Sequence, residues 1–346
     1  MLFNMEEIID EKAGFKIEEI EACKKGKKLL GLGLELTREC NLHCIYCYSD
    51  SGRALPNELG LDELKCVIDE ATSLGVKRIG IIGGGEPLRY KYLSDLINFV
   101  DKRKIKISLF TNGTLINTDW AKYFYLNNIS LVHKLNSFDE IIQDKICKKK
   151  GTFKAISRAL NLLFEIGYPD QLHKLTIETV VLKDNINEIP YIWRWARNRH
   201  IIPMVERVTP MGRAAGLSNI CSASEIKELY EKLSKIDAEE YQNNWEPRPP
   251  IAGDVGCRHN LYSLYITSDG NIQPCSGVSI SLGNVRRNSL RSVLKSKAIL
   301  DLRHIRNKIK GKCNKCNLSE ICYGCRGAAF HYYGDYLAED PFCWKL

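Results

Sequence analysis

The sequence of 346 residues contains no run of eighteen apolar residues, so we expect no membrane span. Residues 1–7 quickly become acidic and lack the basic and then apolar pattern of a signal peptide. Low-complexity tracts are also absent, as is any internal repeat beyond an alternation of short strands and helices. These absences exclude membrane-embedded, secreted and fibrous classes, and we expect a globular protein in the cytoplasm.

Aromatic residues are absent among the Arg and Lys residues that recur between positions 286 and 312. This segment supplies part of the net charge of +8. Because nucleic-acid surfaces commonly combine basic patches with aromatic side chains, we do not expect a nucleic-acid partner. The segment instead favours a solvated face or a docking surface for an acidic electron donor.

Cysteine, by contrast, is abundant, with 14 residues and no secretion signal. This usage favours a reducing compartment and metal ligation over disulfides. Cys40, Cys44 and Cys47 are separated by three and two residues, so their thiolates can converge on one metal centre. Soft thiolates select zinc or iron–sulfur clusters. Three thiols leave a structural zinc one ligand short, whereas a 4Fe–4S cluster held by three thiolates keeps one iron free.

Six apolar segments with strand character alternate with amphipathic helical segments. The predicted strands are residues 29–37, 78–82, 105–109, 131–135, 175–182 and 203–208, and the predicted helices are residues 61–74, 92–100, 118–126, 153–166 and 189–199. Residues 1–28 read as a short helix and a charged link. Such alternation predicts an α/β fold with right-handed βα units around a parallel sheet, whose active site lies at the carboxyl ends of the strands. The alternation stops near Asn243.

Distinctive segments follow these strands, at the edge where an active site is expected. They are Gly83-Gly84-Gly85-Glu86-Pro87, Thr111-Asn112-Gly113, Asn136-Ser137 and Pro210-Met211-Gly212-Arg213-Ala214. Consecutive glycines let a backbone approach a ligand closely, because no Cβ intervenes. Two charged residues are candidate catalytic groups. Glu178, inside the fifth strand, either faces the interior or pairs with a cation on the helix side. Arg213 either pairs with a carboxylate of a ligand or caps the open end of the sheet.

The C-terminal third contains a second group of cysteines. Residues 264–272 read as a β-hairpin with an Asp-Gly turn, which brings Cys257 and Cys275 towards the same end. The remaining thiols are spaced as Cys313-x2-Cys316-x5-Cys322-x2-Cys325, followed by Cys343. Cys-x2-Cys pairs also suit zinc, so a double zinc ribbon remains an alternative for this region. Among the other cysteines, Cys66 lies on an apolar helical stripe and is expected in the core.

The spacing Cys40-x3-Cys44-x2-Cys47, with Tyr46 before the third cysteine, resembles the signature of the radical S-adenosylmethionine (SAM) enzymes. Glycine and Thr-Asn-Gly motifs downstream occur in the same order as in that family. The resemblance implies a partial (β/α)6 barrel over residues 29–242, with SAM chelated to the free iron of the first cluster. It assigns SAM contacts to Tyr46, Gly84, Gly85, Glu86, Pro87, Asn112 and Ser137.

The C-terminal region, residues 243–346, resembles the SPASM extension of this family, a small cysteine-rich domain with a β-hairpin and short helices. The resemblance implies two auxiliary 4Fe–4S clusters, and therefore three clusters in all. One set would be Cys313, Cys316, Cys322 and Cys343, and the other Cys257, Cys275 and Cys325. The spacing before Cys325 departs from the family by one residue. The second set lacks a fourth thiol, for which His259 or a substrate group is a candidate, and Cys221 is a further cysteine within possible reach.

The resemblance implies an enzyme that takes an electron from a low-potential flavodoxin or ferredoxin, cleaves SAM reductively and abstracts hydrogen from a substrate through a 5′-deoxyadenosyl radical. We expect a ribosomally made peptide as the substrate, which would make the protein a peptide maturase. Because about 28 residues precede the barrel, a leader peptide would need a separate binding partner or direct recognition.

Two alternatives remain open. The tail also resembles enzymes of alternative haem synthesis, which favours oxidation or decarboxylation of a small molecule such as a haem precursor. Ser276 stands where sulfatase-maturing relatives usually have Asp, which counts against that activity. The second alternative is a non-catalytic iron–sulfur electron carrier, which would not bind SAM.

Overall fold

The computed structural model describes residues 15–253, 257–319 and 322–345, and the first part of the predicted N-terminal helix and link lies outside this range. Its centre is one eight-stranded sheet in the order β6-β5-β4-β3-β2-β1-β7-β8. The six barrel strands are β1 (Gly31–Leu34), β2 (Arg78–Ile81), β3 (Lys106–Thr111), β4 (Ser130–Lys134), β5 (Leu175–Val181) and β6 (Ile202–Arg207). They pair in parallel, so their carboxyl ends meet at one edge, as predicted.

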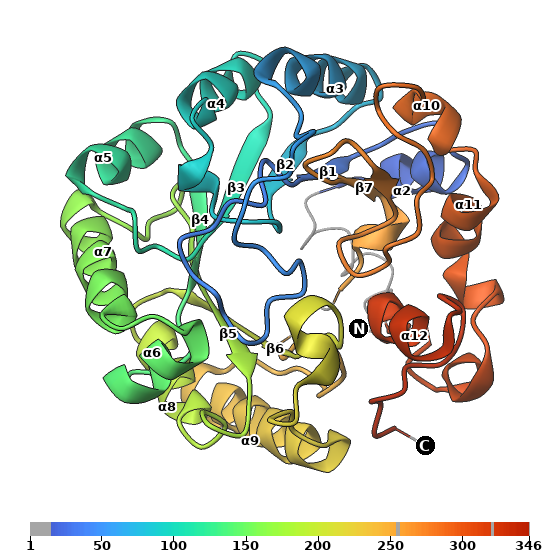
Figure 1. Cartoon of the computed structure of the whole chain (residues 1–346). Helices are drawn as coiled ribbons and strands as arrows, with labels where there is room; N and C mark the ends of the chain where they lie inside the picture. Colours follow the sequence, from blue (N-terminus) through green and yellow to red (C-terminus); the bar gives the residue numbers. More distant parts are fainter. Residues whose placement is uncertain (1–14, 254–256, 320–321, 346) are drawn as a thin grey trace.

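Helices form an outer ring around this curved sheet (Figure 1). The five predicted helices lie within two residues of their expected bounds: α3 (Leu61–Ser73), α4 (Leu93–Asp101), α5 (Thr118–Leu126), α7 (Thr152–Ile166) and α8 (Ile189–Arg197). Strand β5 is buried along its whole length, as expected of a strand with both faces covered. The structure thus confirms the predicted α/β architecture of six parallel strands.

Two further helices were not predicted, although each carries a sequence signal at its start. Helix α6 (Glu140–Cys147) is capped by Asp139, whose carboxylate accepts from two backbone N–H groups. Helix α9 (Ala223–Tyr241) begins with a capping box formed by Ser222 and Glu225. Helix α6 matters most for the site, because its last turn contacts the cysteine loop.

The predicted hairpin is present and consists of β7 (Ser263–Ile266) and β8 (Ile272–Gln273). Its position was not predicted: β7 pairs in parallel with β1, with Gly31 opposite Ser263 and Leu34 opposite Ile266. Leu264, Ile266 and Ile272 belong to the same buried cluster as the barrel strands. The C-terminal region therefore extends the barrel sheet and shares its core.

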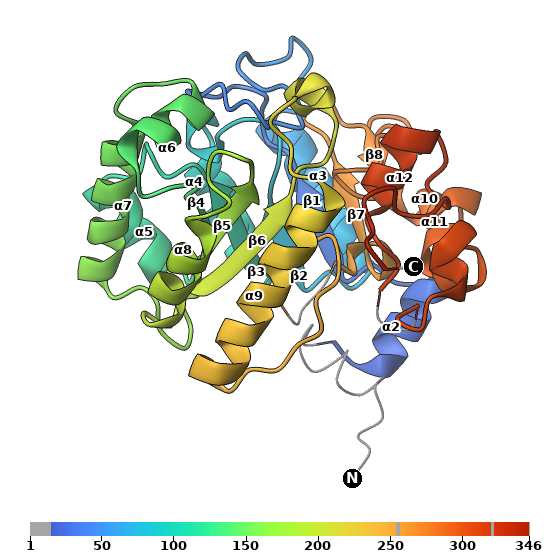
Figure 2. The ribbon, with the colours of Figure 1, turned by 90° about the horizontal axis from the view of Figure 1, so that it is seen from below.

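The rest of the C-terminal region contains short helices, also as predicted. They are α10 (Leu290–Val293), α11 (Lys297–Arg303) and α12 (Arg326–Tyr333), with short 3-10 turns between them. These helices lie beside β7 and near the N-terminal helix α2 (Ile17–Lys24), on the side of the molecule away from α5 to α7 (Figure 2). Within the described ranges, no helix is long and apolar enough to cross a membrane.

Candidate functional site

All three thiols of the Cys40/Cys44/Cys47 loop reach one cavity of about 280 Å³ at the carboxyl edge of the sheet. Gly83 to Glu86 after β2 and Asn112 after β3 line the same cavity. The cavity also contains Lys134, Glu178, Glu206, Arg207, Arg213, Cys257, His259 and Ser276. The topology therefore brings the predicted N-terminal site residues together with part of the C-terminal region.

Arg213 forms several hydrogen bonds to the cysteine loop. Its Nε donates to the carbonyl of Cys44 at 3.0 Å, and its Nη1 donates to the Asp50 carboxylate and the Ser51 carbonyl, both at 2.7 Å. Its backbone N–H donates to the carbonyl of Cys47 at 3.0 Å. The Nη2 atom is buried without a hydrogen-bond partner among the described residues. Arg213 thus fixes the loop backbone and keeps one donor group for a ligand.

The end of helix α6 supports the other side of the loop. The N–H groups of His43 and Ile45 donate to the carbonyls of Cys147 and Ile146, at 3.2 and 3.0 Å. The Cys147 thiol lies against Cys44, and their hydrogen bond, followed by burial, raises the pKa of Cys44. The loop is therefore anchored to a helix that the sequence reading missed.

The three thiols differ in their ease of ionisation. Burial raises the pKa of Cys40 to about 11. Burial acts in the same direction on Cys47, but contacts with the hydroxyls of Ser49 and Ser51, at 3.3 and 3.2 Å, outweigh it and lower its pKa. No cysteine within the described ranges is in a disulfide. Three free thiols on one cavity are a donor set that fits an iron–sulfur cluster.

The glycine run lies directly against the cysteine loop. The N–H groups of Gly85 and Glu86 donate to the carbonyls of Thr37 and Glu39, at 2.6 and 2.8 Å. A Cβ at Gly85 would lie 1.8 Å from the Glu39 carbonyl oxygen, so no larger residue fits. The glycines are therefore needed for close packing between two loops, and part of their exposed backbone faces the cavity.

Glu86 is buried beneath the same loops. Its carboxylate accepts from the Thr111 hydroxyl at 2.6 Å and from the Asn112 N–H at 2.7 Å. Burial raises its pKa to about 7 despite these hydrogen bonds. Pro87 starts a 3-10 turn (Pro87–Arg89), is buried and does not line the cavity.

Three other predicted SAM contacts have different surroundings. The Asn112 amide donates to Asn41 at 3.0 Å and lies 3.9 Å from the sulfur of Cys40. The Tyr46 hydroxyl accepts from Asn136 at 3.0 Å and faces the cavity. Ser137 is buried but does not line the cavity, and its hydroxyl instead donates to the half-buried Glu188. The structure therefore brings Asn112 to the cysteine loop, which contains Tyr46, whereas Ser137 does not line the cavity.

Glu178 faces the cavity rather than the helices, and it has a cation beside it. Lys134 on the neighbouring strand lies opposite it, with Nζ 2.5 Å from its carboxylate. Glu206 on β6 completes the group, and burial together with Glu178 raises its pKa well above its usual value. The sequence reading missed Lys134 and Glu206, although charged residues inside apolar strands were a usable signal.

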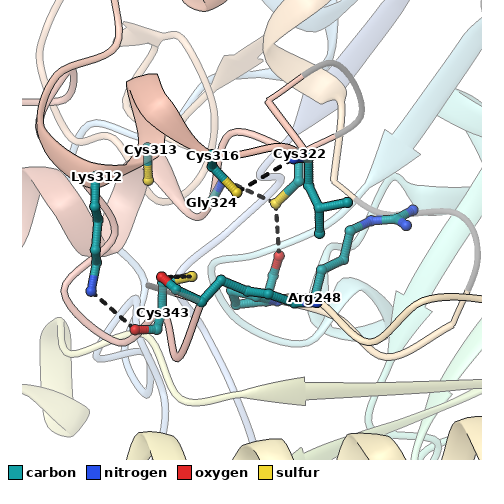
Figure 3. A pocket seen from close by; sticks show the side chains of 10 residues that line it. Arg248, Lys312, Cys313, Cys316, Cys322, Gly324 and Cys343 are labelled. Atoms are coloured by element: carbon teal, nitrogen blue, oxygen red, sulfur yellow. Dashed lines mark hydrogen bonds between the residues drawn. The ribbon is translucent and has the colours of Figure 1, made fainter.

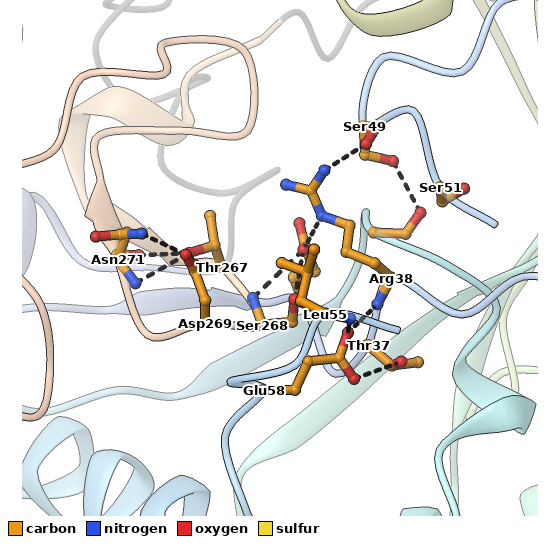
Figure 4. A network of polar contacts seen from close by, with 12 residues as sticks. Thr37, Arg38, Ser49, Ser51, Leu55, Glu58, Thr267, Ser268, Asp269 and Asn271 are labelled. Carbon is orange, nitrogen blue, oxygen red and sulfur yellow. Dashed lines mark hydrogen bonds and ion pairs between the residues drawn. The ribbon is translucent and has the colours of Figure 1, made fainter. Parts of the chain in front are cut away.

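A polar network connects the hairpin turn to the cysteine loop (Figure 4). Buried Glu35 accepts from the hydroxyls of Ser268 and Tyr265, at 2.9 and 3.0 Å, and forms an ion pair with Arg38. Arg38 also donates to the carbonyl of Ser49. Glu58 accepts from the Arg38 N–H and the Thr37 hydroxyl, at 2.6 and 2.8 Å. The loop position therefore depends on the C-terminal hairpin.

One predicted auxiliary set is gathered around a single pocket, which Cys313, Cys316, Cys322 and Cys343 all line (Figure 3). The backbone N–H groups of Leu318, Gly324 and Asp340 point at the sulfurs of Cys316, Cys322 and Cys313, each at 3.4 Å. Arg248, Lys312 and Lys345 line the same pocket. Backbone donors and cations around four thiols suit an anionic iron–sulfur cluster.

The second set, Cys257, Cys275 and Cys325, is also brought together. Burial raises the pKa of Cys275 to about 11, and the charge of the nearby Cys325 is the next cause. The pKa of Cys257 is also raised, first by burial and then by the charges of Cys275 and Cys325. Cys257 and the exposed His259 line the main cavity. This set therefore borders the same space as the cysteine loop.

Cys221 and Cys66 do not join these sets. Cys221 is buried in a separate apolar cluster around α9. Cys66 is exposed, so the prediction that it lies in the core was wrong, because its helical position faces solvent. Within the described ranges, no three His, Cys, Asp or Glu side chains enclose a point closely enough for a single metal ion.

A buried ion pair joins the barrel to the cysteine-rich tail. Arg207 on β6 donates to both carboxylate oxygens of Asp340, at 2.8 and 2.7 Å. Asp340 is fully buried, and its carboxylate also accepts from the Cys325 N–H at 2.7 Å. Its own N–H faces the sulfur of Cys313. Asp340 therefore contacts both auxiliary cysteine sets and the cavity wall.

Comparison with known proteins agrees with this geometry. Residues 34–196 match the radical SAM superfamily, and residues 257–317 match the SPASM iron–sulfur cluster-binding domain. The AdoMet-dependent heme synthase of Methanosarcina barkeri is 27% identical over 89% of this chain and 94% of its own length. The mycofactocin maturase MftC of Mycolicibacterium smegmatis is 28% identical over 58% of this chain and 50% of its own.

Among solved structures, anSMEcpe with bound AdoMet and the Cp18Cys peptide superposes with a TM-score of 0.71 at 18% identity. The superposition covers 90% of this chain and 93% of that one, which supports the barrel and hairpin architecture. The chain therefore belongs to the radical SAM superfamily and carries a C-terminal SPASM domain, so it is an enzyme that uses SAM, a 4Fe–4S cluster and auxiliary iron–sulfur clusters.

Proposed function

We propose that this enzyme oxidises a small-molecule substrate of the haem-precursor class, by removing hydrogen and carboxylate groups from its side chains. The observation that carries the proposal is the shared cavity, which the three loop thiols enter on one side and Cys257 and His259 on another. A substrate there would lie between the site of hydrogen abstraction and an electron acceptor.

The expected peptide substrate has less support than this alternative. The heme synthase relative matches along 89% of the chain, whereas the mycofactocin maturase matches along 58%. Peptide maturation therefore remains the second candidate, supported by the match to that maturase. The electron-carrier alternative is not retained, because the chain belongs to a family of enzymes.

For the SAM site, we propose that Cys40, Cys44 and Cys47 hold the first cluster. Tyr46, Gly84, Gly85, Glu86 and Asn112 would contact SAM, while Pro87 and Ser137 would act by supporting their neighbours. When bound, the cluster and SAM supply the electron and the 5′-deoxyadenosyl radical that removes hydrogen from the substrate. Arg213 holds the loop in place, and its Nη2, which has no hydrogen-bond partner in the described part of the chain, can bind a carboxylate of SAM or substrate.

Within the cavity, the buried Glu178 and the half-buried Lys134 and Glu206 form a group with one cation and two carboxyls. Because Glu206 keeps its proton to a higher pH than usual, it can donate a hydrogen bond to a substrate carboxylate. We propose substrate binding as the role of Glu178 and Glu206.

We further propose that residues 29–242 form the SAM barrel, preceded by the link 1–28, and that residues 243–346 hold two auxiliary clusters, three clusters in total. Cys313, Cys316, Cys322 and Cys343 would bind one, and Cys257, Cys275 and Cys325 the other, with His259 or substrate at its fourth position. A low-potential flavodoxin or ferredoxin in the cytoplasm would supply electrons.

The test is anaerobic turnover of the reconstituted enzyme with SAM, dithionite and iron-coproporphyrin III, a porphyrin that carries propionate side chains. We expect 5′-deoxyadenosine and a porphyrin product that has lost carbon dioxide together with hydrogen, seen by mass spectrometry. The methyl ester of the same porphyrin is the matched control and should not react. Formation of 5′-deoxyadenosine with an unchanged porphyrin would contradict the proposed substrate.

A further inference from the structure

A run of three exposed lysines, Lys148, Lys149 and Lys150, follows directly after helix α6. The Lys149 ammonium donates to the backbone carbonyl of Asn41 at 3.0 Å. Asn41 is the residue after Cys40, so this contact is made to the cysteine loop itself. The basic run therefore lies beside the backbone that presents the first set of thiols.

The charges of this run are balanced unequally by nearby carboxylates. The neighbouring Lys145 pairs with Asp184 at 3.0 Å, and Lys150 borders a shallow hollow that three acidic side chains also line. Within the described ranges, Lys148 and Lys149 form no ion pair. Two exposed positive charges next to the cysteine loop are therefore available to a negatively charged partner.

The cysteine loop reaches the protein surface at the same place. His43 is exposed, and its backbone N–H donates to the carbonyl of Cys147, the residue directly before Lys148. Cys44, one of the proposed cluster ligands, directly follows His43. A protein that covers Lys148 and Lys149 would therefore also lie over the outer side of the loop.

The other basic segment, residues 286–312, suits such a partner less well. Several of its cations already have carboxylate partners, as Arg286 has in Glu63 and Lys297 in Asp301. The segment also contains α10 and α11, which lie on the side of the molecule opposite α6 (Figure 1). Its ion pairs and position favour a solvated face that supports the tail.

We propose that Lys148 and Lys149, with the exposed His43, form the docking surface for an acidic one-electron donor protein of the flavodoxin or ferredoxin class. The inference rests on the proposed function, because it requires a cluster in the cysteine loop that such a donor reduces. Opposite charges steer the encounter of two proteins and raise its rate, mainly at low salt. The donor loses one electron and the loop cluster gains it, with no proton or bond transferred at the surface.

The test compares Lys148→Glu/Lys149→Glu with the parent protein, both reconstituted with their clusters. Release of 5′-deoxyadenosine from SAM is measured with a limiting amount of reduced, acidic flavodoxin and, separately, with dithionite, a small reductant that needs no docking surface. At low salt we expect the flavodoxin-driven rate to fall about tenfold, while the dithionite-driven rate stays unchanged. The loss should shrink at about 1 M salt, where the Debye length is only about 3 Å.

The double variant Lys25→Glu/Lys27→Glu is the matched control. Both lysines are exposed beside the end of α2 and form no ion pair in the part of the chain that the structure describes. Helix α2 lies at the opposite edge of the sheet from the cysteine loop (Figure 2). This variant changes the net charge equally and should retain both rates. Lys148→Glu alone keeps the Lys149 contact to the loop and should show part of the flavodoxin-specific loss.

Equal losses in the two double variants would overturn the inference, because net charge alone would then explain them. An unchanged flavodoxin-driven rate in Lys148→Glu/Lys149→Glu would also overturn it. So would a loss of the dithionite-driven rate in Lys148→Glu, which would mean that the lysine supports the loop and does not bind a donor. If the parent protein releases no 5′-deoxyadenosine even with dithionite, the proposed SAM site fails instead.

Discussion

The cysteine loop of the barrel and the cysteine-rich tail present thiols to a metal centre in different ways. The loop sulfurs face an open cavity, and the loop backbone is held by distant segments, including Arg213 and the end of helix α6. Backbone N–H groups point at sulfurs in both regions, as Leu42 does at Cys40 and Leu318 at Cys316, but the tail pocket has a volume of only about 20 Å³, compared with about 280 Å³ for the loop cavity. The first arrangement leaves room for a second ligand, whereas the second suits an enclosed cluster that transfers electrons.

Removing the loop thiols is expected to have the largest effect and would separate the two regions most clearly. Changing Cys40, Cys44 and Cys47 together to Ala should abolish SAM cleavage, since no iron would remain to bind SAM. Iron should fall from about twelve to about eight atoms per chain, because the tail clusters stay.

Release of 5′-deoxyadenosine and iron analysis measure the two results. The exposed Cys66 provides the control, and Cys66→Ala should retain both activity and iron. Residual cleavage in the triple variant would mean that the tail can also activate SAM, which would remove the distinction between the regions.

Breaking the link between the regions should have the next largest effect. Asp340→Asn leaves the buried Arg207 guanidinium without its counter-charge, which should cost roughly 3–5 kcal/mol of unfolding free energy. Iron in the tail should also fall, because Asp340 contacts both auxiliary cysteine sets.

Chemical denaturation and iron analysis test this expectation. Glu240→Gln breaks the exposed ion pair with Arg194 and serves as the control, with little change in either measurement expected. If Asp340→Asn behaves like Glu240→Gln, the two regions do not depend on each other.

Glu86 provides a smaller, pH-dependent test at the barrel side. Its pKa rises from an ordinary 4.5 to about 7 on folding, so the folded state holds its proton more tightly. The stability that this proton provides is present below pH 4.5 and is lost as the pH rises through about 7. The change is roughly 3 kcal/mol, since one pKa unit corresponds to 1.36 kcal/mol.

Urea denaturation of the iron-free protein between about pH 5 and 8 measures how the free energy of unfolding changes with pH. The Gln in the Glu86→Gln variant cannot titrate. The free energy of unfolding of this variant should therefore fall less over the same pH range, whether the variant is more or less stable than the parent protein. Equal slopes in the two proteins would show that Glu86 is ionised throughout and that its hydrogen bonds from Thr111 and Asn112 outweigh burial.

The sequence predicted the features whose signals are local. Strand and helix periodicity placed the barrel elements within a few residues, and the family resemblance implied the cysteine set that lines the Figure 3 pocket. The pairing of β7 with β1 was not predictable in this way, because nothing near Ser263 in the sequence specifies a partner at Gly31. Glu178 was predicted as a candidate, but Lys134 and Glu206 were not; their charges inside apolar strands were a signal, yet only strand register shows that they lie beside Glu178.

The position of β1 in the sheet has a consequence for synthesis of the chain. Gly31 pairs with Ser263, which is 232 residues later, so one edge of β1 lacks its native partner while the barrel is being made. At usual translation rates this interval lasts roughly 10–50 s. An unpaired apolar edge is a site for wrong strand pairing, and such long-range closure slows folding. Nascent chains of this protein should therefore depend on chaperones until the hairpin has emerged.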